Sequence, residues 1–320
     1  MMGLDKDIKT ESTEAAPVLK IEHLNISFTR YEQGLYRKTM SVIRDMDLNV
    51  FAGEMVAVVG SSGSGKSLLA HAVLGLLPYN AKAGGRITYC GSELTAERIK
   101  QLRGSEIVMV PQSLSCLDPL MKIGPQIRKG KKDKRTRNKL KDIFTRYDLE
   151  ESVEGLYPFE LSGGMSRRIL ISTALMEEPK LVIADEPTPG LDLRVAKRAM
   201  GHFRELADMG AGVLVITHDL ELALETADRI VVFYAGESIE EAGVSDFHHE
   251  ETLRHPYTKA LWRAMPRNGF YCIDGVQPYA KDMPKGCAFA PRCARCTQEC
   301  SQEIPYRELR GGRVRCLSAV

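Results

Sequence analysis

The glycine-rich stretch at residues 60–67, GSSGSGKS, constrains this chain more than any other feature. It follows the apolar run at residues 55–59 and precedes an apolar segment, so the pattern predicts a strand, a tight turn and a helix start. Glycines let the backbone curl so that successive N–H groups point at one anion. The stretch therefore predicts a cradle for the phosphates of a nucleotide, lined by Gly60, Ser61, Ser62, Gly63, Ser64, Gly65, Lys66, Ser67 and Leu68.

Two side chains of this stretch have distinct expected roles. Lys66 carries a charge that can reach the β- and γ-phosphates, and the hydroxyl of Ser67 is the expected ligand of Mg²⁺. The helix that begins near Gly65 adds unpaired N–H groups and the positive end of its dipole. The alternative is a flexible Ser/Gly loop, but the preceding strand, the spacing, Lys66 and Ser67 together favour a phosphate site.

The bulk composition is that of an ordinary soluble globular protein. The chain has 320 residues, 43% hydrophobic and 27% charged, which allows one large core with an appendage or two domains. Its net charge of +2 argues against a nucleic-acid or membrane partner held by global charge. No apolar run approaches the roughly 18 residues of a membrane span, so we expect any work at a membrane to depend on other chains. Residues 1–17 are polar and lack the apolar core of a secretory signal, so we expect a disordered tail and a cytoplasmic protein.

Alternating residues near the N-terminus predict antiparallel strands. Residues 19–28 alternate apolar and polar side chains, and residues 41–43 and 47–50 continue the pattern after an excursion through Gly34. An aromatic side chain on such a strand can stack on a purine base. Phe28 is the first choice for this role, with Tyr31 and Tyr36 behind it, and the alternative is a plain core aromatic.

A polar amide and a helical insert follow. Gln112 comes just after the apolar run at residues 107–110, where a side chain of an open α/β sheet reaches the ligand crevice, although a surface amide fits equally. Apolar residues recur at helical spacing around Leu140 and Phe144, which predicts a helical region over about residues 113–178. The basic run at residues 129–135 could contact phospholipid headgroups or nucleic acid, but a solvated surface is the favoured interpretation.

A second glycine turn lies at residues 161–165, LSGGM. Ser162 is a natural N-cap, and Gly163 and Gly164 at a helix start expose N–H groups to an incoming anion. Taken alone, this turn is weak evidence.

Polar residues also end two buried strands. The apolar run at residues 181–184 leads into Asp185 and Glu186, which would face the same crevice as the phosphate cradle. Asp185 can then hold Mg²⁺ through water, and Glu186 can orient or deprotonate an attacking water. The run at residues 213–217 ends at His218, whose imidazole can donate a hydrogen bond to a γ-phosphate.

Together these motifs resemble the nucleotide-binding subunit of an ATP-binding cassette (ABC) transporter. Residues 60–67 match the phosphate loop, Gln112 the Q-loop and residues 161–165 the LSGG signature, while residues 181–186 match the Walker B strand. Asp192 then belongs to the D-loop and His218 is the switch histidine. The resemblance implies an α/β P-loop NTPase cassette over residues 18–250, with a RecA-like parallel sheet core, an antiparallel β subdomain and a helical subdomain.

The last part of the chain is similar to the oligopeptide/dipeptide/nickel permease subfamily. Residues 255–258, HPYT, match its post-cassette motif within an expected extension at residues 251–320. Clustered cysteines in a reducing compartment suggest metal or cluster ligation sooner than disulfides. The resemblance associates a 4Fe-4S cluster with four of them, namely Cys287, Cys293, Cys300 and Cys316. A zinc site and merely reduced thiols remain alternative interpretations. Cys296 is an extra thiol.

The resemblance implies an ATPase that binds ATP and Mg²⁺, the latter at Ser67 and Gln112, and powers import of small peptides or of nickel and metal chelates. Its expected partners are a second ABC ATPase subunit in a heterodimer, two transmembrane permease subunits and an extracytoplasmic substrate-binding protein, at the cytoplasmic face of the cell membrane. No nucleic acid is expected. The alternatives are a soluble ABC ATPase of nucleic-acid repair or translation, and a regulatory cassette with a redox-sensing cysteine tail.

Overall fold

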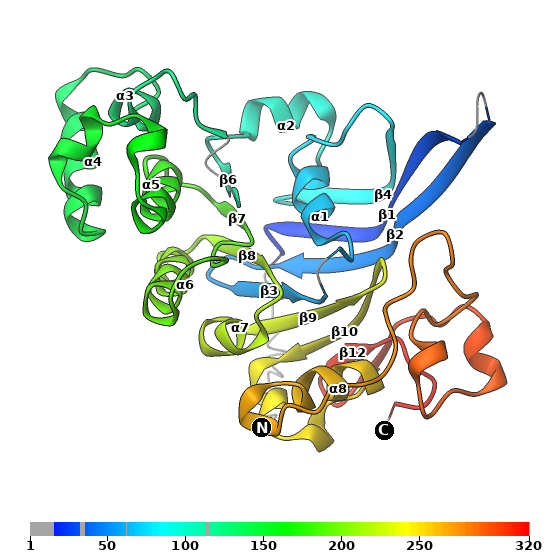
Figure 1. Cartoon of the computed structure of the whole chain (residues 1–320). Helices are drawn as coiled ribbons and strands as arrows, with labels where there is room; N and C mark the ends of the chain where they lie inside the picture. The colour runs from blue at the N-terminus through cyan, green and yellow to red at the C-terminus, as the bar shows by residue number, and fades with distance from the viewer. Residues whose placement is uncertain (1–15, 33–35, 62, 113–115, 320) are drawn as a thin grey trace, which may run out of the picture.

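The computed structural model describes residues 16–32, 36–61, 63–112 and 116–319. One mixed sheet runs through this part of the chain (Figure 1). Its strands lie side by side in the order β5 (Ser92–Glu93), β4 (Ala81–Tyr89), β1 (Leu19–Glu32), β2 (Tyr36–Val50), β10 (Glu237–Gly243), β9 (Arg229–Tyr234), β3 (Met55–Val59), β8 (Gly212–Thr217), β7 (Leu181–Asp185) and β6 (Ile107–Val110).

The sheet has an antiparallel and a parallel part. β1 pairs antiparallel with β2 and β4, as the alternating N-terminal pattern predicts. β9, β3, β8, β7 and β6 are parallel neighbours, and their uninterrupted apolar sequences match burial on both faces. Because side chains alternate along a strand, Val182 and Ala184 enter one core while Leu181 and Ile183 enter another.

Helices cover the parallel strands and form a separate lobe. They are α1 (Lys66–Val73), α2 (Ala96–Leu102), α3 (Ile123–Ile127), α4 (Lys134–Arg146), α5 (Gly163–Leu175), α6 (Leu193–Asp208), α7 (Leu220–Thr226) and α8 (Pro256–Arg263). Figure 1 shows α3, α4 and α5 grouped beyond β6, where the helical region was expected. None of the described helices combines the length and apolarity that crossing a bilayer requires.

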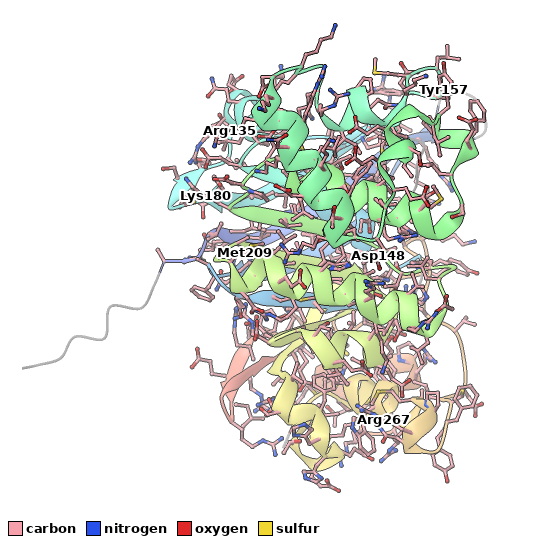
Figure 2. The ribbon with its side chains drawn as sticks, turned by 90° about the vertical axis from the view of Figure 1, so that its left-hand side faces the viewer. Arg135, Asp148, Tyr157, Lys180, Met209 and Arg267 are labelled. Carbon is pink, nitrogen blue, oxygen red and sulfur yellow. The ribbon has the colours of Figure 1, made fainter. Side chains whose placement is uncertain are left out.

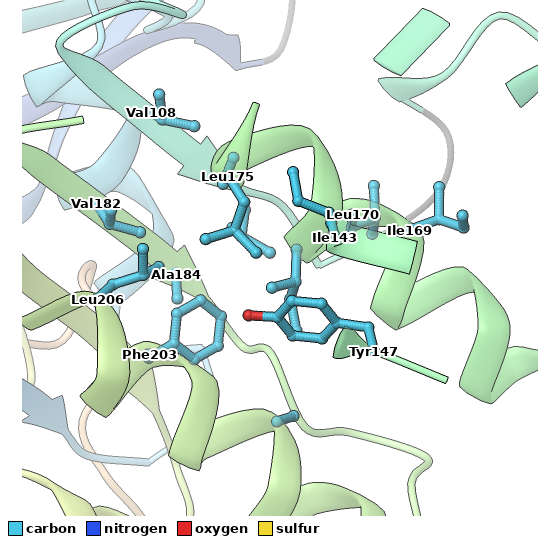
Figure 3. Close-up of a cluster of buried hydrophobic side chains, with 14 of the residues drawn as sticks. Val108, Ile143, Tyr147, Ile169, Leu170, Leu175, Val182, Ala184, Phe203 and Leu206 are labelled. Carbon is cyan, nitrogen blue, oxygen red and sulfur yellow. The ribbon is translucent and has the colours of Figure 1, made fainter. Parts of the chain in front are cut away.

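The helical lobe is joined to the sheet by a shared core. Leu140, Ile143 and Phe144 are buried, at the spacing that predicted α4. They meet Phe203 of α6 and Val182 of β7 in the cluster drawn in Figure 3. The basic segment before α4 stays largely exposed, which agrees with a solvated surface, and Figure 2 places Arg135 at the opposite end of the molecule from Arg267.

Two local expectations were wrong. The apolar segment at residues 68–77, followed by Pro78, predicts a helix to Leu77, but α1 ends at Val73, and Gly75 takes a positive φ of 62° that a helix does not allow. The apolar run at residues 230–236 is followed by polar residues, which predicts that the sheet ends there, but β10 follows and pairs antiparallel with β9.

The hydrophobic pattern of the sequence does not predict β10, because the buried side chains of this strand include glutamates. Glu240 is fully buried and accepts hydrogen bonds from the backbone N–H groups of Arg254 and His255, at 2.9 and 2.7 Å. The guanidinium of Arg254 lies 3.4 Å from the same carboxylate. Arg229 pairs with Glu241 at 3.1 Å. Buried charges are tolerated only when they are paired and hydrogen-bonded in this way.

The C-terminal segment extends this edge of the sheet. β12 (Gly312–Val314) pairs antiparallel with β10 and with β11 (Arg307–Leu309). Residues beyond 250 therefore contribute strands to the cassette sheet, and the division into residues 18–250 and 251–320 stays a prediction. The expected tail, residues 1–17, lies outside the described residues except for its last two.

The HPY motif has a structural explanation at the start of α8. His255 caps the helix, because its Nδ1 accepts a hydrogen bond of 3.0 Å from the N–H of Tyr257, and Pro256 occupies the first turn. Full burial disfavours the imidazolium and lowers the pKa of His255 to about 3. His255 is therefore neutral in the folded protein at every physiological pH.

This burial predicts a pH-dependent stability. Below pH 6.5 the unfolded chain binds a proton at His255, whereas the folded chain does not. The contribution of His255 to the free energy of unfolding is therefore present above pH 6.5. It falls by about 1.4 kcal/mol per pH unit toward pH 5. We expect His255→Asn, which keeps a capping oxygen, to flatten this slope in urea unfolding curves. His249→Asn removes an exposed histidine and should keep the wild-type slope; an unchanged slope in His255→Asn would contradict the assignment.

Candidate nucleotide and magnesium site

The loop between β3 and α1 has the curvature that its glycines predict. Gly63 and Gly65 have φ of 75° and 100°, in the left-handed region that glycine adopts without strain. A Cβ on Gly60 would lie 2.1 Å from the carbonyl oxygen of Phe233, so only glycine fits against β9 there. Ser62 lies outside the described residues.

Lys66 is folded back onto this loop. Its Nζ donates hydrogen bonds to the carbonyl oxygens of Gly60 and Ser61, at 2.8 and 2.9 Å. The side chain is only 5% exposed, and burial lowers the pKa of Lys66, against the opposing charges of Glu186 and Asp185. The ammonium group is thus held by two uncharged carbonyl oxygens of the loop.

Ser67 and Asp185 supply neighbouring oxygens. The hydroxyl of Ser67 donates to Oδ1 of Asp185 at 3.0 Å. Burial raises the pKa of Asp185, and the hydrogen bond from Ser67 opposes this rise. A hydroxyl and a buried carboxylate next to an expected phosphate form the oxygen-rich donor set that Mg²⁺ prefers, so these residues fit that ion.

Glu186 occupies an unusual backbone position. Its φ of 46° lies in the left-handed region, which costs a non-glycine residue about 1–2 kcal/mol. Its N–H donates to the carbonyl of Ile216 at 2.8 Å, which ties this turn to β8. Oε2 lies 2.8 Å from Nδ1 of His218, and Oε1 lies 4.0 Å from Nζ of Lys66. The carboxylate is therefore held between an imidazole and an ammonium group.

A pocket of about 480 Å³ is lined by these side chains with the exception of Asp185, which lies behind Ser67. Five of the predicted site residues come together there from separate parts of the chain, namely Lys66, Ser67, Gln112, Glu186 and His218. Gly63, Gly65 and Leu68 also line it, as expected. Val42 and Pro189 complete the wall and were not predicted. Val42 is an ordinary strand residue without a distinguishing signal, whereas Pro189 directly precedes the Gly190 turn of the D-loop.

Other predicted residues lie away from this pocket. Phe28 is partly buried on β1 against the core under α1 and is not among the pocket residues, so its role in base stacking stays a prediction. Ser162 caps α5 by accepting from the N–H of Met165 at 3.3 Å, as predicted, but Gly163 and Gly164 begin a helix of the separate lobe. Asp192 caps α6 at the N–H of Val195, 3.0 Å away.

The cysteines of the C-terminal segment gather in a second place. Burial raises the pKa of Cys287 to about 11, and the neighbouring thiols of Cys316 and Cys300 add to this rise. Burial also raises the pKa of Cys316, and the neighbouring thiols of Cys293 and Cys300 add to that rise. Every described cysteine is a free thiol.

The distances between these thiols restrict which metal they could hold. Tetrahedral zinc, with Zn–S bonds of about 2.3 Å, needs sulfur atoms roughly 4 Å apart. Among the described residues, the group with three ligand atoms within 4.8 Å of one another is His23, Asp45 and Asp47, and not the cysteines. Arg315 already pairs with both of those aspartates, at 2.6 and 2.9 Å. The thiols are thus grouped more loosely than a zinc site requires.

Comparisons with known proteins agree with this geometry. Residues 43–189 match the ABC transporter family, and residues 239–300 match the C-terminal region of oligopeptide/dipeptide transporters. The oligopeptide transport ATP-binding protein OppD of Escherichia coli is 33% identical over 94% of this chain and 93% of its own length. The dipeptide transport ATP-binding protein DppD of Bacillus subtilis is 34% identical, with coverage of 92% and 91%.

Solved structures show the same cassette. A dimeric bacterial ABC transporter cassette superposes with a TM-score of 0.61 and 25% identity over 71% of this chain and 98% of its own. A post-hydrolysis cassette structure bound to ADP and phosphate gives a TM-score of 0.61 at 26% identity, with the same coverage. This chain belongs to the ABC transporter family as an ATP-binding subunit. It is an ATPase, as the sequence predicted.

Proposed function

We propose that this protein is the ATP-hydrolysing subunit of a membrane importer for small peptides. The observation that carries the proposal is the pocket that joins Lys66, Ser67, Gln112, Glu186 and His218. The cargo rests on the family match of residues 239–300 and on the names of the relatives, which are peptide and dipeptide transport proteins. Those names favour peptides over nickel or metal chelates, and transport over nucleic-acid repair or translation.

In this proposal the loop at residues 60–67 receives the phosphates of ATP. Lys66 exchanges the carbonyl oxygens of Gly60 and Ser61 for the β- and γ-phosphate oxygens, which are stronger partners because they are charged. Ser67, Gln112 and Asp185 would hold Mg²⁺ directly or through water. When bound, this ion neutralises charge that develops on the phosphates.

Glu186 orients and deprotonates the attacking water, and His218 positions Glu186 and senses the γ-phosphate. The 2.8 Å contact between these two side chains supports this division of labour. The ATP bound by a second cassette would contact Ser162, Gly163, Gly164 and Asp192 of this chain. Their place on the helical lobe and at the start of α6, outside the pocket of their own chain, supports that assignment.

Replacing the catalytic carboxylate separates binding from hydrolysis. We expect Glu186→Gln to lower kcat for ATP hydrolysis by about 10²–10⁴-fold, because an amide cannot take a proton from water. The Kd for ATP should stay within about threefold of the wild-type value.

Lys66→Ala should instead abolish measurable ATP binding in calorimetry, since it removes the buried ammonium group. Glu178→Gln, at a side chain that is 88% exposed, is the matched control and should hydrolyse ATP normally. Near-normal hydrolysis by Glu186→Gln would remove Glu186 from the proposed mechanism.

We propose that the helical lobe takes a helix of a transmembrane permease at the cytoplasmic face of the cell membrane, in an assembly with two permease subunits. Leu120 and Phe159 of this lobe are 87% and 74% exposed, large apolar side chains that a permease helix could cover. A second, related ABC subunit would complete the cassette pair, and an extracytoplasmic protein would deliver the peptide.

Purification from membranes tests this assembly. Extraction of the tagged chain in mild detergent should co-purify two membrane subunits and a second cassette, and Leu120→Asp with Phe159→Asp should release the membrane subunits while ATP binding is kept. Recovery with ribosomes or DNA, and without membrane subunits, would favour the nucleic-acid alternative.

We further propose that a 4Fe-4S cluster, whose usual ligands are thiolates, is bound by Cys287, Cys293, Cys300 and Cys316, which are neighbours in the structure. We expect anaerobically purified protein to contain about four irons and four sulfides per chain. Cys287→Ser should lose them, whereas Cys272→Ser, at an exposed cysteine outside the set, should not. Stoichiometric zinc in place of iron would contradict the cluster, and metal-free protein whose ATPase responds to thiol oxidation would favour the redox-sensing alternative.

A further inference from the structure

The phosphate loop is contacted by a residue from the far end of the chain. The hydroxyl of Ser61 donates a hydrogen bond to Oε1 of Gln277, across 216 positions of sequence. Gln277 lies in the segment between α8 and the cysteines, which Figure 1 shows rising from the C-terminal region beside the sheet. The phosphate-loop motif ends at Ser67, so a residue at position 277 is no part of it.

We propose that Gln277 is a positioning residue for ATP: by fixing Ser61, the C-terminal segment holds the phosphate loop in its nucleotide-ready shape. This inference rests on the proposed nucleotide site. It adds a residue that the cassette itself does not supply.

The segment that carries Gln277 is itself anchored. Arg292 donates from Nε to the carbonyl of Asp274 at 2.9 Å and from Nη2 to the carbonyl of Ile273 at 3.2 Å. Its Nη1 lies 3.4 Å from the hydroxyl of Tyr234 on β9. Because Arg292 ties the segment to the sheet only a few residues before Gln277, the amide is presented to Ser61 on a fixed support.

Tyr257 of the HPY motif also lies beside Ser61. Its ring packs 4.4 Å from that of Tyr234 and 5.4 Å from that of Phe289, between centroids. Burial raises the pKa of Tyr257 to about 12, and hydrogen bonding with the side chain and backbone of Ser61 opposes the rise. The phenol therefore keeps its proton and lies beside Ser61 as a neutral group.

The physical effect follows from what Ser61 does next. Its carbonyl oxygen is one of the two acceptors that hold Lys66, at 2.9 Å. A loop fixed at Ser61 keeps Lys66 and the N–H groups in place before ATP arrives, so less conformational freedom is lost on binding. Loss of the Gln277 contact should therefore weaken ATP binding and leave the hydrolytic step unchanged.

The test is a double-mutant cycle on the full chain. Gln277→Ala should raise the calorimetric Kd and the KM for ATP by about 3–10-fold, the effect of one hydrogen bond, with kcat within about twofold. Ser61→Ala should cause a similar loss, and the double variant should bind no worse than either single variant. Gln298→Ala, at an exposed glutamine of the same region, is the control and should match the wild type.

The outcomes separate this inference from the proposed function. An unchanged or lower Kd in Gln277→Ala, a loss confined to kcat, or additive losses in the double variant would overturn the positioning role. Failure of the wild-type chain to bind ATP would overturn the proposed function itself. Equal melting temperatures for Gln277→Ala and Gln298→Ala will show that a change in Kd does not come from unfolding.

Discussion

The parallel pairing of β3, β8 and β7 is the constraint on which the site depends. Val59 lies opposite Thr217, and Asp185 lies opposite Ile216, so the three strands end at nearly the same level. Polar groups that follow those ends must converge, because parallel strands direct their carboxyl ends to one edge of the sheet. A slip of one residue in this register would turn Asp185 toward the opposite face.

Convergence brings charges together, and each is stabilised by another. Lys66 is buried beside two carboxylates, which oppose the lowering of its pKa by burial. Burial and the charge of Glu186 raise the pKa of Asp185, while the hydrogen bond from Ser67 and the charge of Lys66 oppose this rise. His218 lies 2.8 Å from the carboxylate of Glu186. Titratable groups whose pKa values are shifted by burial and by neighbouring charges are typical of functional sites.

Local patterns predicted those parts of the fold whose interactions are local. The glycine turn before Lys66, the cap at Ser162 and the apolar strands all form within a few residues of sequence, and the structure has them. β10 was missed because Glu240 and Glu241 are charged residues that become core residues only by pairing with Arg254 and Arg229, which lie outside the strand. Val42 and Gln277 were missed for the same reason, since their roles arise from tertiary contact and leave no periodic signal.

The buried pair of Glu240 and Arg254 has a consequence for the architecture of the whole chain. Arg254 also donates to the carbonyl oxygens of Leu309 and Arg310, so one guanidinium joins β10 to the C-terminal hairpin. A chain cut after residue 250 would leave Glu240 as an uncompensated charge inside the sheet. The C-terminal region therefore cannot be exchanged independently of β10. Gain, loss or transfer of that region between cassettes would require the sequence of β10 to change at the same time.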